Sequence, residues 1–304
     1  MRMANAIDTL AKTAGGMRDS FGRRIDYLRI SVTDRCDLRC RYCMDEIMQF
    51  LPKREILTLE EIAIIAQRFI ARGVKRIRLS GGEPLVRRDF ADLAYALGRH
   101  VKSGALDELT LTTNGTQLRK HAEMLVDAGM RRINVSLDAL DPAIFSHVTR
   151  GGDVAQVLDG LEAARDAGLK VKLNTVALRG VNEDQVLPLL ARFRGSGHIV
   201  RFIEYMDVGT CNGWRRGDIV DTAQLRDRIA ARWPRAWRRY GRGAPIDTAN
   251  CAAAHRHAAA GTWKCILSAA NRFLPRPCHA SRHPRLPTSM RPAVRRWSMC
   301  RPNR

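Results

Sequence analysis

The sequence predicts an α/β protein in which strands and helices alternate around a parallel sheet. Two observations predict this fold class. Six short runs rich in Ile, Val, Leu and Thr have an apolar period near two, as strands do, and helix-like runs separate them. Repeated strand–helix units place successive strands in parallel through right-handed crossovers. With six units, a partial open barrel and a doubly wound sheet both fit the pattern.

Each element has a local signal of its own. We predict the strands at residues 25–32, 76–80, 108–112, 132–137, 170–175 and 199–205. The first helix follows Thr58, because residues 58–61 have the Ser/Thr-x-x-Glu form of a capping box and the apolar residues after them share one helical face. Another helix opens at Asp153 and ends at Gly168. The remaining helices are predicted at 90–100, 117–128, 183–193 and 222–232.

The charge divides the chain into unequal parts. The 304 residues carry a net charge of +21, and 15 basic residues stand against one acid in residues 235–304. We therefore predict an N-terminal extension at 1–23, an enzyme-like body at 24–233, and a basic, low-order tail at 234–304 without a helical or strand period. The tail fits three interpretations: a nucleic-acid-binding arm, a second metal site, or a segment translated out of frame, which is our preferred hypothesis.

No run of residues approaches the ~18 consecutive apolar residues of a membrane-spanning helix. The first 24 residues lack the apolar core of a signal peptide, so we expect a cytoplasmic protein. Eight cysteines in such a compartment favour metal or redox chemistry over a disulfide framework.

Polar and thiol-bearing residues gather where the predicted strands end. A cysteine-rich segment follows the first strand, a Gly-Gly-Glu-Pro turn at 81–84 follows the second, and a Thr-Asn-Gly turn at 113–115 follows the third. The later strands end in polar residues at 136–138, 174–175 and 206–207. Ligands of parallel α/β folds bind beyond the carboxyl ends of the strands, so we expect a ligand site at this edge.

Three cysteines in the first of these segments have metal-ligand spacing. Cys36, Cys40 and Cys43 form a C-x3-C-x2-C pattern. Soft thiolates select iron–sulfur clusters, zinc or Cu(I), and structural zinc takes four ligands, whereas no fourth Cys or His lies nearby. Three thiolates suit a cubane cluster with one iron left open. A zinc site completed from the tail and unrelated free thiols are also consistent with the spacing.

The triad, the aromatic Tyr42 before its last cysteine and the later Gly-Gly-Glu-Pro turn resemble the radical S-adenosylmethionine superfamily. A longer series of segments is similar to the GTP 3',8-cyclase family of molybdenum cofactor biosynthesis (MoaA family). The similarity covers about residues 20–232. The matching segments are 28–36, 43–44, 50–52, 77–89, 111–115, 132–138, 171–176, 179–182, 201–206 and 212–214.

The resemblance implies a partial (β/α)6 TIM-like barrel with one [4Fe–4S] cluster on Cys36, Cys40 and Cys43. It implies S-adenosylmethionine on the open iron, a 5'-deoxyadenosyl radical that takes hydrogen from C3' of GTP, and attack of the sugar radical on C8. A flavodoxin or ferredoxin would supply the electron, and a homodimer is consistent with the family. The matching S-adenosylmethionine contacts are Tyr42, Gly82, Ser136 and Met206, and the matching GTP contacts are Arg29, Arg78, Thr112 and Lys172.

These residue types suit their implied ligands. Glycine lets a ligand approach the backbone closely, and Tyr42 and Met206 offer polarizable faces to adenine. Considered alone, Ser136 is explained as a hydroxyl at the end of a strand, and Met206 is explained as a core residue. Cationic side chains inside a barrel are costly without an anion, and a triphosphate supplies one.

The sequence departs from that family after residue 233. The family holds a second cluster with a C-x2-C motif and a third cysteine, whereas no two of the later cysteines here are three residues apart. We therefore predict one cluster and impaired cyclisation. A metal site built from Cys251, Cys265 and Cys278 with His255, His257 or His279 would also fit the tail. Two rival functions are a radical enzyme acting on a different substrate and an inactive, basic nucleic-acid-binding remnant.

Overall fold

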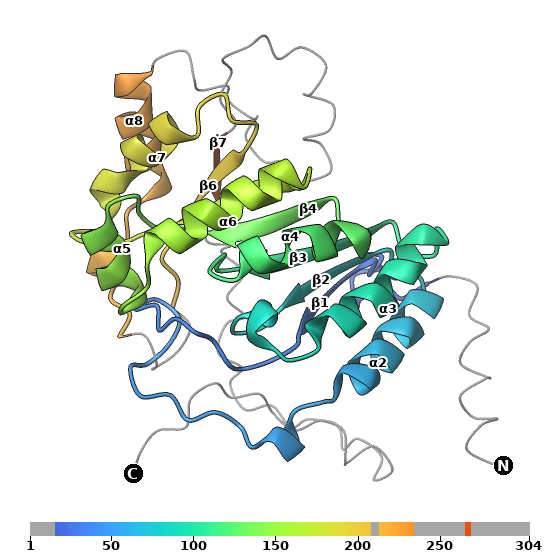
Figure 1. Cartoon of the computed structure of the whole chain (residues 1–304). Coiled ribbons are helices and arrows are strands. Elements are labelled where there is room, and N and C mark those ends of the chain that lie inside the picture. The colour runs from blue at the N-terminus through green and yellow to red at the C-terminus, as the bar shows by residue number, and fades with distance from the viewer. Residues whose placement is uncertain (1–15, 208–212, 234–264, 269–304) are drawn as a thin grey trace, which may run out of the picture.

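The computed structural model describes residues 16–207, 213–233 and 265–268 of the chain. Seven parallel strands lie side by side in chain order, from β1 to β7. A doubly wound sheet reverses its strand order at a switch point, and this sheet does not. Within the described residues β1 and β7 are the two outer strands, so the sheet is the open, partial barrel of the two predicted architectures (Figure 1).

The strands and helices follow the predicted alternation closely. The strands are β1 (Tyr27–Ser31), β2 (Arg76–Ser80), β3 (Glu108–Thr113), β4 (Arg132–Ser136), β5 (Lys170–Ala177), β6 (Ile199–Glu204) and β7 (Cys265–Ser268). The α-helices are α2 (Leu59–Ala71), α3 (Phe90–Lys102), α4 (Leu118–Asp127), α5 (Pro142–Thr149), α6 (Val154–Asp166), α7 (Val186–Arg192) and α8 (Thr222–Arg232). Short 3-10 turns lie at Lys53–Glu55, Pro84–Val86, Glu183–Gln185 and Arg216–Asp218.

Local signals explain where several helices begin. The predicted capping box is present: Glu61 N–H donates to Thr58 Oγ1 over 3.2 Å and Thr58 N–H donates to Glu61 Oε2 over 2.8 Å. Helix α5 was not predicted from the sequence. Its signal is the Asp141-Pro142 pair, in which Asp141 accepts from Ile144 N–H over 3.0 Å and proline occupies the first helical turn.

The two faces of the sheet differ in chemistry. Most residues of β2 to β6 that face the helices are apolar and buried, and they form one core with the inner sides of the helices. In Figure 1, α2, α3, α4 and α6 cover this outer face. The alternate residues point to the inner face, and most are polar or charged. Several of these polar residues are themselves buried, among them Thr110, Asn134 and Lys172. Parallel sheets covered by helices on both faces are apolar on both, so this polar inner face suits a polar ligand.

The structure corrects one prediction for the basic tail. No strand pattern was predicted after residue 233, whereas Cys265–Ser268 forms β7 and pairs in parallel with β6. Pairing along the free edge of β6 fixes this short segment without a repeating pattern of its own. The predicted disorder of the tail and the candidate ligands Cys251, Cys278, His255, His257 and His279 lie outside the described residues.

No helix in the described part of the chain is both long enough and apolar enough to cross a membrane.

Candidate active site

The cysteine segment, residues 33–43, lies directly beyond the carboxyl end of β1. The Gly-Gly-Glu turn after β2 is hydrogen-bonded to the first half of this segment. Gly82 N–H donates to Thr33 O and Glu83 N–H donates to Arg35 O, both over 2.8 Å. A Cβ atom on Gly82 would lie 2.2 Å from Arg35 O. Glycine is therefore required here by contact between two backbone segments, a cause that was not predicted from the sequence.

The end of α5 holds the second half of the segment. Arg39 N–H donates to Thr149 O over 3.0 Å, and Arg41 N–H donates to Val148 O over 2.9 Å. The guanidinium of Arg150 donates to Arg39 O over 3.0 Å and to Met44 O over 2.8 Å. The segment thus has anchors near both ends from elements far away in the sequence.

A third anchor is the aromatic ring of Phe50. The guanidinium carbons of Arg35 and Arg39 lie 5.6 Å and 5.1 Å from the ring centroid, which is cation–π range. Leu51 N–H donates to Asp34 Oδ2 over 2.7 Å. These contacts hold residues 50–51 against the cysteine segment.

The three thiols differ in environment. Burial raises the pKa of the Cys36 thiol to about 12. Cys40 donates its S–H to Cys43, and this bond raises the pKa of Cys40 and lowers that of Cys43. Cys40 is buried, Cys36 is half-buried and Cys43 is exposed. Coordination to a metal removes a thiol proton outright, so burial of the thiol does not prevent metal binding.

Three thiols on one short segment are a donor set that suits an iron–sulfur cluster. No three His, Cys, Asp or Glu side chains among the described residues converge on a point that a single metal ion could occupy. Thiolates of an iron–sulfur cubane bind different irons and need no such convergence. In addition, the Cys36 sulfur accepts a bond from Leu38 N–H over 3.4 Å, as cluster ligands commonly do.

Tyr42 is tied to a buried carboxylate. Its hydroxyl donates to Asp138 Oδ2 over 2.9 Å, and Val176 N–H donates to Asp138 Oδ1 over 2.9 Å. Burial raises the pKa of Asp138 to about 6, although both hydrogen bonds lower it. Burial also raises the pKa of Tyr42. Asp138 was predicted only as a strand-end residue, without a role. An acid directly after a buried strand was the available signal.

A second buried carboxylate joins two strand ends. Glu83 is fully buried, and it accepts from Thr113 Oγ1 over 2.8 Å, Asn114 N–H over 2.5 Å and Leu85 N–H over 3.0 Å. Burial raises its pKa to about 7 against the effect of these donors. Glu83 therefore connects the turn after β2 with the turn after β3.

The other residues predicted to contact S-adenosylmethionine lie at the same edge of the sheet. Ser136 is the last residue of β4, where it pairs in register with Asn174 of β5, and it is half-buried. Met206 follows β6 and keeps 47% of its surface exposed. The structure thus brings Tyr42, Gly82, Ser136 and Met206 to one edge, from four different strands.

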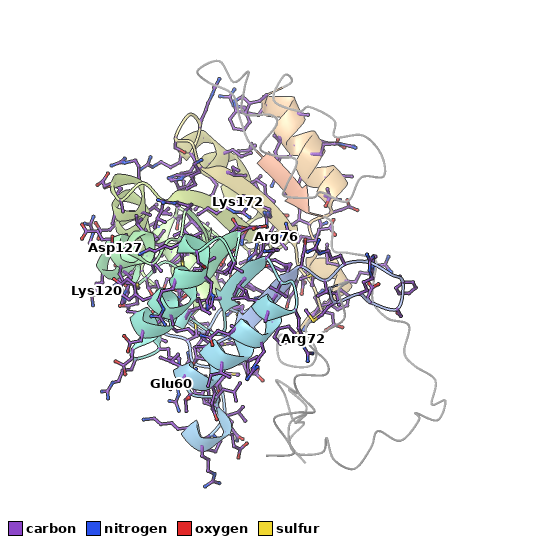
Figure 2. The ribbon with its side chains drawn as sticks, turned by 90° about the vertical axis from the view of Figure 1, so that its right-hand side faces the viewer. Glu60, Arg72, Arg76, Lys120, Asp127 and Lys172 are labelled. Atoms are coloured by element: carbon purple, nitrogen blue, oxygen red, sulfur yellow. The ribbon has the colours of Figure 1, made fainter. Side chains whose placement is uncertain are left out.

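The four residues predicted to contact GTP all lie on the polar inner face. Arg29 of β1 and Arg78 of β2 are register partners, and Arg29 donates to Ser80 Oγ over 2.7 Å. Thr112 of β3 and Lys172 of β5 are both register partners of Asn134 in β4. Lys172 is 6% exposed. Figure 2 labels Lys172 together with Arg76, another cation of this face.

Arg78 has an unusual environment for a cation. Its Nε is buried and has no hydrogen-bond partner in the described part of the chain. Its guanidinium stacks over the Tyr27 ring at 5.4 Å, and burial lowers the pKa of Arg78. A buried donor without an acceptor is costly, and a ligand with acceptor oxygens would satisfy it.

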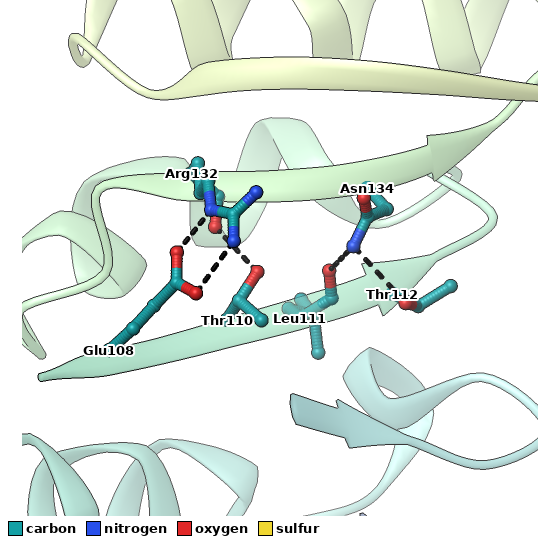
Figure 3. Close-up of polar contacts among 6 residues, drawn as sticks. All are labelled: Glu108, Thr110, Leu111, Thr112, Arg132 and Asn134. Atoms are coloured by element: carbon teal, nitrogen blue, oxygen red, sulfur yellow. Dashed lines mark hydrogen bonds and ion pairs between the residues drawn. The ribbon is translucent and has the colours of Figure 1, made fainter. Parts of the chain in front are cut away.

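The inner face also carries polar residues that were not singled out from the sequence. Glu108 of β3 and Arg132 of β4 form a bidentate ion pair (Figure 3). Asn134 donates to Leu111 O over 3.3 Å and to Thr112 Oγ1 over 3.5 Å. Arg201 of β6 pairs in register with Asn174. Charged residues at alternate positions of interior strands were the signal that could have found them.

Known proteins resemble this chain in sequence over most of its length. The sequence profile of the Radical SAM superfamily matches residues 30–193. The chain is 54% identical over 220 residues to a GTP 3',8-cyclase of Erythrobacter litoralis, covering 72% of this chain and 66% of that protein. The corresponding protein of Bradyrhizobium diazoefficiens is also 54% identical over 220 residues, covering 72% of this chain and 64% of its own length. The GTP 3',8-cyclase of Caulobacter vibrioides is 49% identical over 231 residues, covering 76% and 66%.

The chain therefore spans just under two thirds of the length of these curated relatives.

Solved structures share its fold at low sequence identity. SuiB of Streptococcus suis bound to S-adenosylmethionine superposes with a TM-score of 0.58 at 16% identity, covering 81% of this chain and 50% of that one. Methylornithine synthase (PylB) gives a TM-score of 0.52 at 16% identity, covering 77% and 68%. These two likenesses bear out the predicted partial barrel.

Proposed function

The chain belongs to the Radical SAM superfamily, and from its identity to GTP 3',8-cyclases we propose that it converts GTP to the cyclised precursor of pyranopterin in molybdenum cofactor biosynthesis. Membership of this superfamily implies a [4Fe–4S] cluster and S-adenosylmethionine. The observation that carries the proposal is the polar inner face with cations from several strands, next to the cysteine segment. Over 72% of the chain, 54% of the aligned residues are identical to those of two GTP 3',8-cyclases.

In this proposal Cys36, Cys40 and Cys43 hold the cluster. When bound, the cluster and S-adenosylmethionine supply an electron and a 5'-deoxyadenosyl group for radical hydrogen abstraction. The chain contributes the shape of the site: Gly82 and the end of α5 fix the cysteine segment, and Asp138 fixes the hydroxyl of Tyr42. Tyr42, Gly82, Ser136 and Met206 contact S-adenosylmethionine at the carboxyl edge.

The inner face binds the substrate. Arg29, Arg78 and Lys172 offer positive charge to the triphosphate, and Thr112 offers a hydroxyl. The supporting observations are the shared face, the burial of Lys172, and the unpartnered Nε of Arg78 within the described residues. Charge-assisted bonds from Arg and Lys to phosphate oxygens are about twice as strong as neutral ones. The proposed role of these residues is to hold GTP by its phosphates and so orient the nucleoside.

Several expectations remain predictions. They are the body at 24–233 as the catalytic unit, a cytoplasmic location, an electron donor of flavodoxin or ferredoxin type, and a homodimer. Impaired cyclisation, predicted from the missing C-x2-C motif, also remains a prediction. Turnover of the reconstituted protein tests that prediction together with the proposed reaction.

The test uses anaerobically reconstituted, reduced protein given S-adenosylmethionine with and without GTP. Mass spectrometry measures 5'-deoxyadenosine and the cyclised GTP product. Formation of both supports the full proposal. Deoxyadenosine without cyclised product supports the barrel chemistry and means impaired cyclisation or a different substrate. A chain that assembles the cluster but forms neither product is an inactive relative, and salt-dependent binding of nucleic acid would then favour a nucleic-acid-binding protein.

Matched variants make the result specific. Cys36→Ala should abolish deoxyadenosine formation. Arg78→Met should reduce GTP conversion and leave the absorbance of the cluster unchanged. Arg165→Met is the control for removing an arginine, because Arg165 is exposed and pairs with its neighbour Asp166 on the surface of α6.

A further inference from the structure

Asn114 links the turn after β3 to a proposed cluster ligand. Its side-chain Nδ2 lies 3.7 Å from Cys36 Sγ and 2.6 Å from Asp37 Oδ1, and it donates to both. Its Oδ1 accepts from Thr116 N–H over 3.0 Å. Because Oδ1 faces a backbone donor, the amide presents its N–H groups to Cys36 and Asp37.

The position of Asn114 is set from outside the cysteine segment. Its backbone N–H donates over 2.5 Å to the fully buried carboxylate of Glu83, which also accepts from Thr113 Oγ1 over 2.8 Å. The backbone on which the amide stands is therefore fixed by the ends of β2 and β3. Because this support comes from outside the cysteine segment, the Asn114 amide can keep its orientation toward Cys36 when a cluster binds.

The Cys36 sulfur differs from the other two in this respect. It accepts from Leu38 N–H over 3.4 Å and from the Asn114 amide. In the part of the chain that the structure describes, the hydrogen bond that joins Cys40 and Cys43 is between the two thiols themselves. One of the three sulfurs thus carries a side-chain N–H bond from a different loop.

We propose that Asn114 is a positioning residue that raises the reduction potential of the cluster through its N–H···S bond to Cys36. The inference rests on the proposed cluster on Cys36, Cys40 and Cys43. Reduction increases negative charge on the sulfurs, so an N–H donor stabilises the reduced state more than the oxidised state. Such partners outside the ligand set commonly tune metal sites. The chain thus favours acceptance of the electron that radical chemistry needs.

The experiment is a redox titration of the reconstituted full chain, followed by the electron paramagnetic resonance signal of the reduced cluster. No substrate is added, so activity is not the readout. Asn114→Ala should shift the midpoint to more negative potential, with the ratio of reduced to oxidised cluster at a fixed potential falling by up to about tenfold, or about 59 mV for one electron. Asn114→Asp should shift it further, because a carboxylate then replaces the donor.

Thr116→Val is the matched control. Thr116 Oγ1 lies 2.5 Å from Asp37 Oδ2 and 2.9 Å from Asn114 Oδ1, so this variant removes both hydroxyl contacts. It keeps the bond from Thr116 N–H to Asn114 Oδ1 and the N–H donor of Asn114. Its potential should equal that of the wild type. An unchanged potential in both Asn114 variants, or an equal shift in Thr116→Val, overturns the inference alone. A wild-type chain that assembles no [4Fe–4S] cluster, judged by iron and sulfide content, overturns the proposed function and this inference with it.

Discussion

The outer and inner faces of the same strands differ in the polarity of their side chains. The outer face of β2 to β6 carries Ile, Leu, Val and Phe packed against the helices, with residues such as Leu79 and Leu111 fully buried. The inner face of these strands carries Arg78, Lys172 and the Glu108–Arg132 pair. Side chains alternate between faces along a strand, so both faces are encoded within each short segment.

The difference separates stability from function. Burial of apolar area on the outer face drives folding, at roughly 25 cal/mol per Å² removed from water. The inner face gains little from burial, because cations lose hydration and a carboxylate neutralises only part of their charge. In the proposed function, the phosphates of GTP would offset this cost on the inner face. Substitutions on the two faces should therefore give different phenotypes.

The largest effect is expected on the outer face. Leu111→Ala leaves a cavity at a fully buried position of β3. The free energy of unfolding should fall by about 2–5 kcal/mol, as for other buried leucines. Urea denaturation measures this, and the GTP affinity of the fraction that stays folded should be unchanged. A loss of affinity in folded Leu111→Ala protein would break the separation between the two faces.

The next effect tests buried charge at the carboxyl edge through pH. The pKa of Glu83 rises from 4.5 to about 7 on folding, so between these values the folded state binds more protons than the unfolded state. Stability should then fall as the pH rises from 4.5 to 7, by about 3 kcal/mol at 1.36 kcal/mol per pKa unit. Glu83→Gln does not titrate and should lose this slope. Identical pH slopes of unfolding free energy in the two proteins would contradict the assignment.

A change on the inner face should affect binding more than stability. Arg78→Met removes the guanidinium whose Nε has no partner among the described residues, and it keeps an apolar side chain of similar length. Affinity for GTP should fall about 10- to 100-fold, since hydrogen bonds to charged groups contribute about 1.5–3 kcal/mol. The melting temperature should stay the same or rise, because a buried cation is removed. Calorimetry measures both quantities. A lower melting temperature with unchanged GTP affinity would mean that Arg78 contributes to stability and not to GTP binding.

The smallest effect is expected at a charge pair on the outer surface of the helices. Arg119 of α4 pairs with Asp159 of α6, and both side chains are about half exposed. Arg119→Ala should change the free energy of unfolding by less than about 1 kcal/mol, because exposed pairs are screened by solvent. Chemical denaturation at low and high salt measures it. A cost comparable with that of Leu111→Ala would mean that charge pairs rather than apolar burial hold the helices.

The predictability of each element depended on how local its cause is. Arg76–Ser80 and Thr222–Arg232 have the predicted bounds because apolar period and capping are properties of neighbouring residues. Helix α5 was missed because it is short and its signal is the Asp141-Pro142 start alone. Strand β7 was missed because its pairing with β6 joins segments that are far apart in the sequence. The sequence predicted the C-x3-C-x2-C segment from its spacing, but it did not predict the contacts that hold this segment to the turn after β2 and to the end of α5.

The sequence by itself determined the alternation of strands and helices, the C-x3-C-x2-C segment and the polar residues at the strand ends. These follow from short-range spacing, which the chain carries wherever it folds. Only the tertiary structure decided between an open barrel and a doubly wound sheet, because strand order is a matter of long-range pairing. It also decided that Glu83 and Asp138 are buried, that Gly82 contacts the backbone of Arg35, and that Asn114 reaches Cys36. Contacts between distant segments depend on how whole elements pack, and spacing along the chain does not encode them.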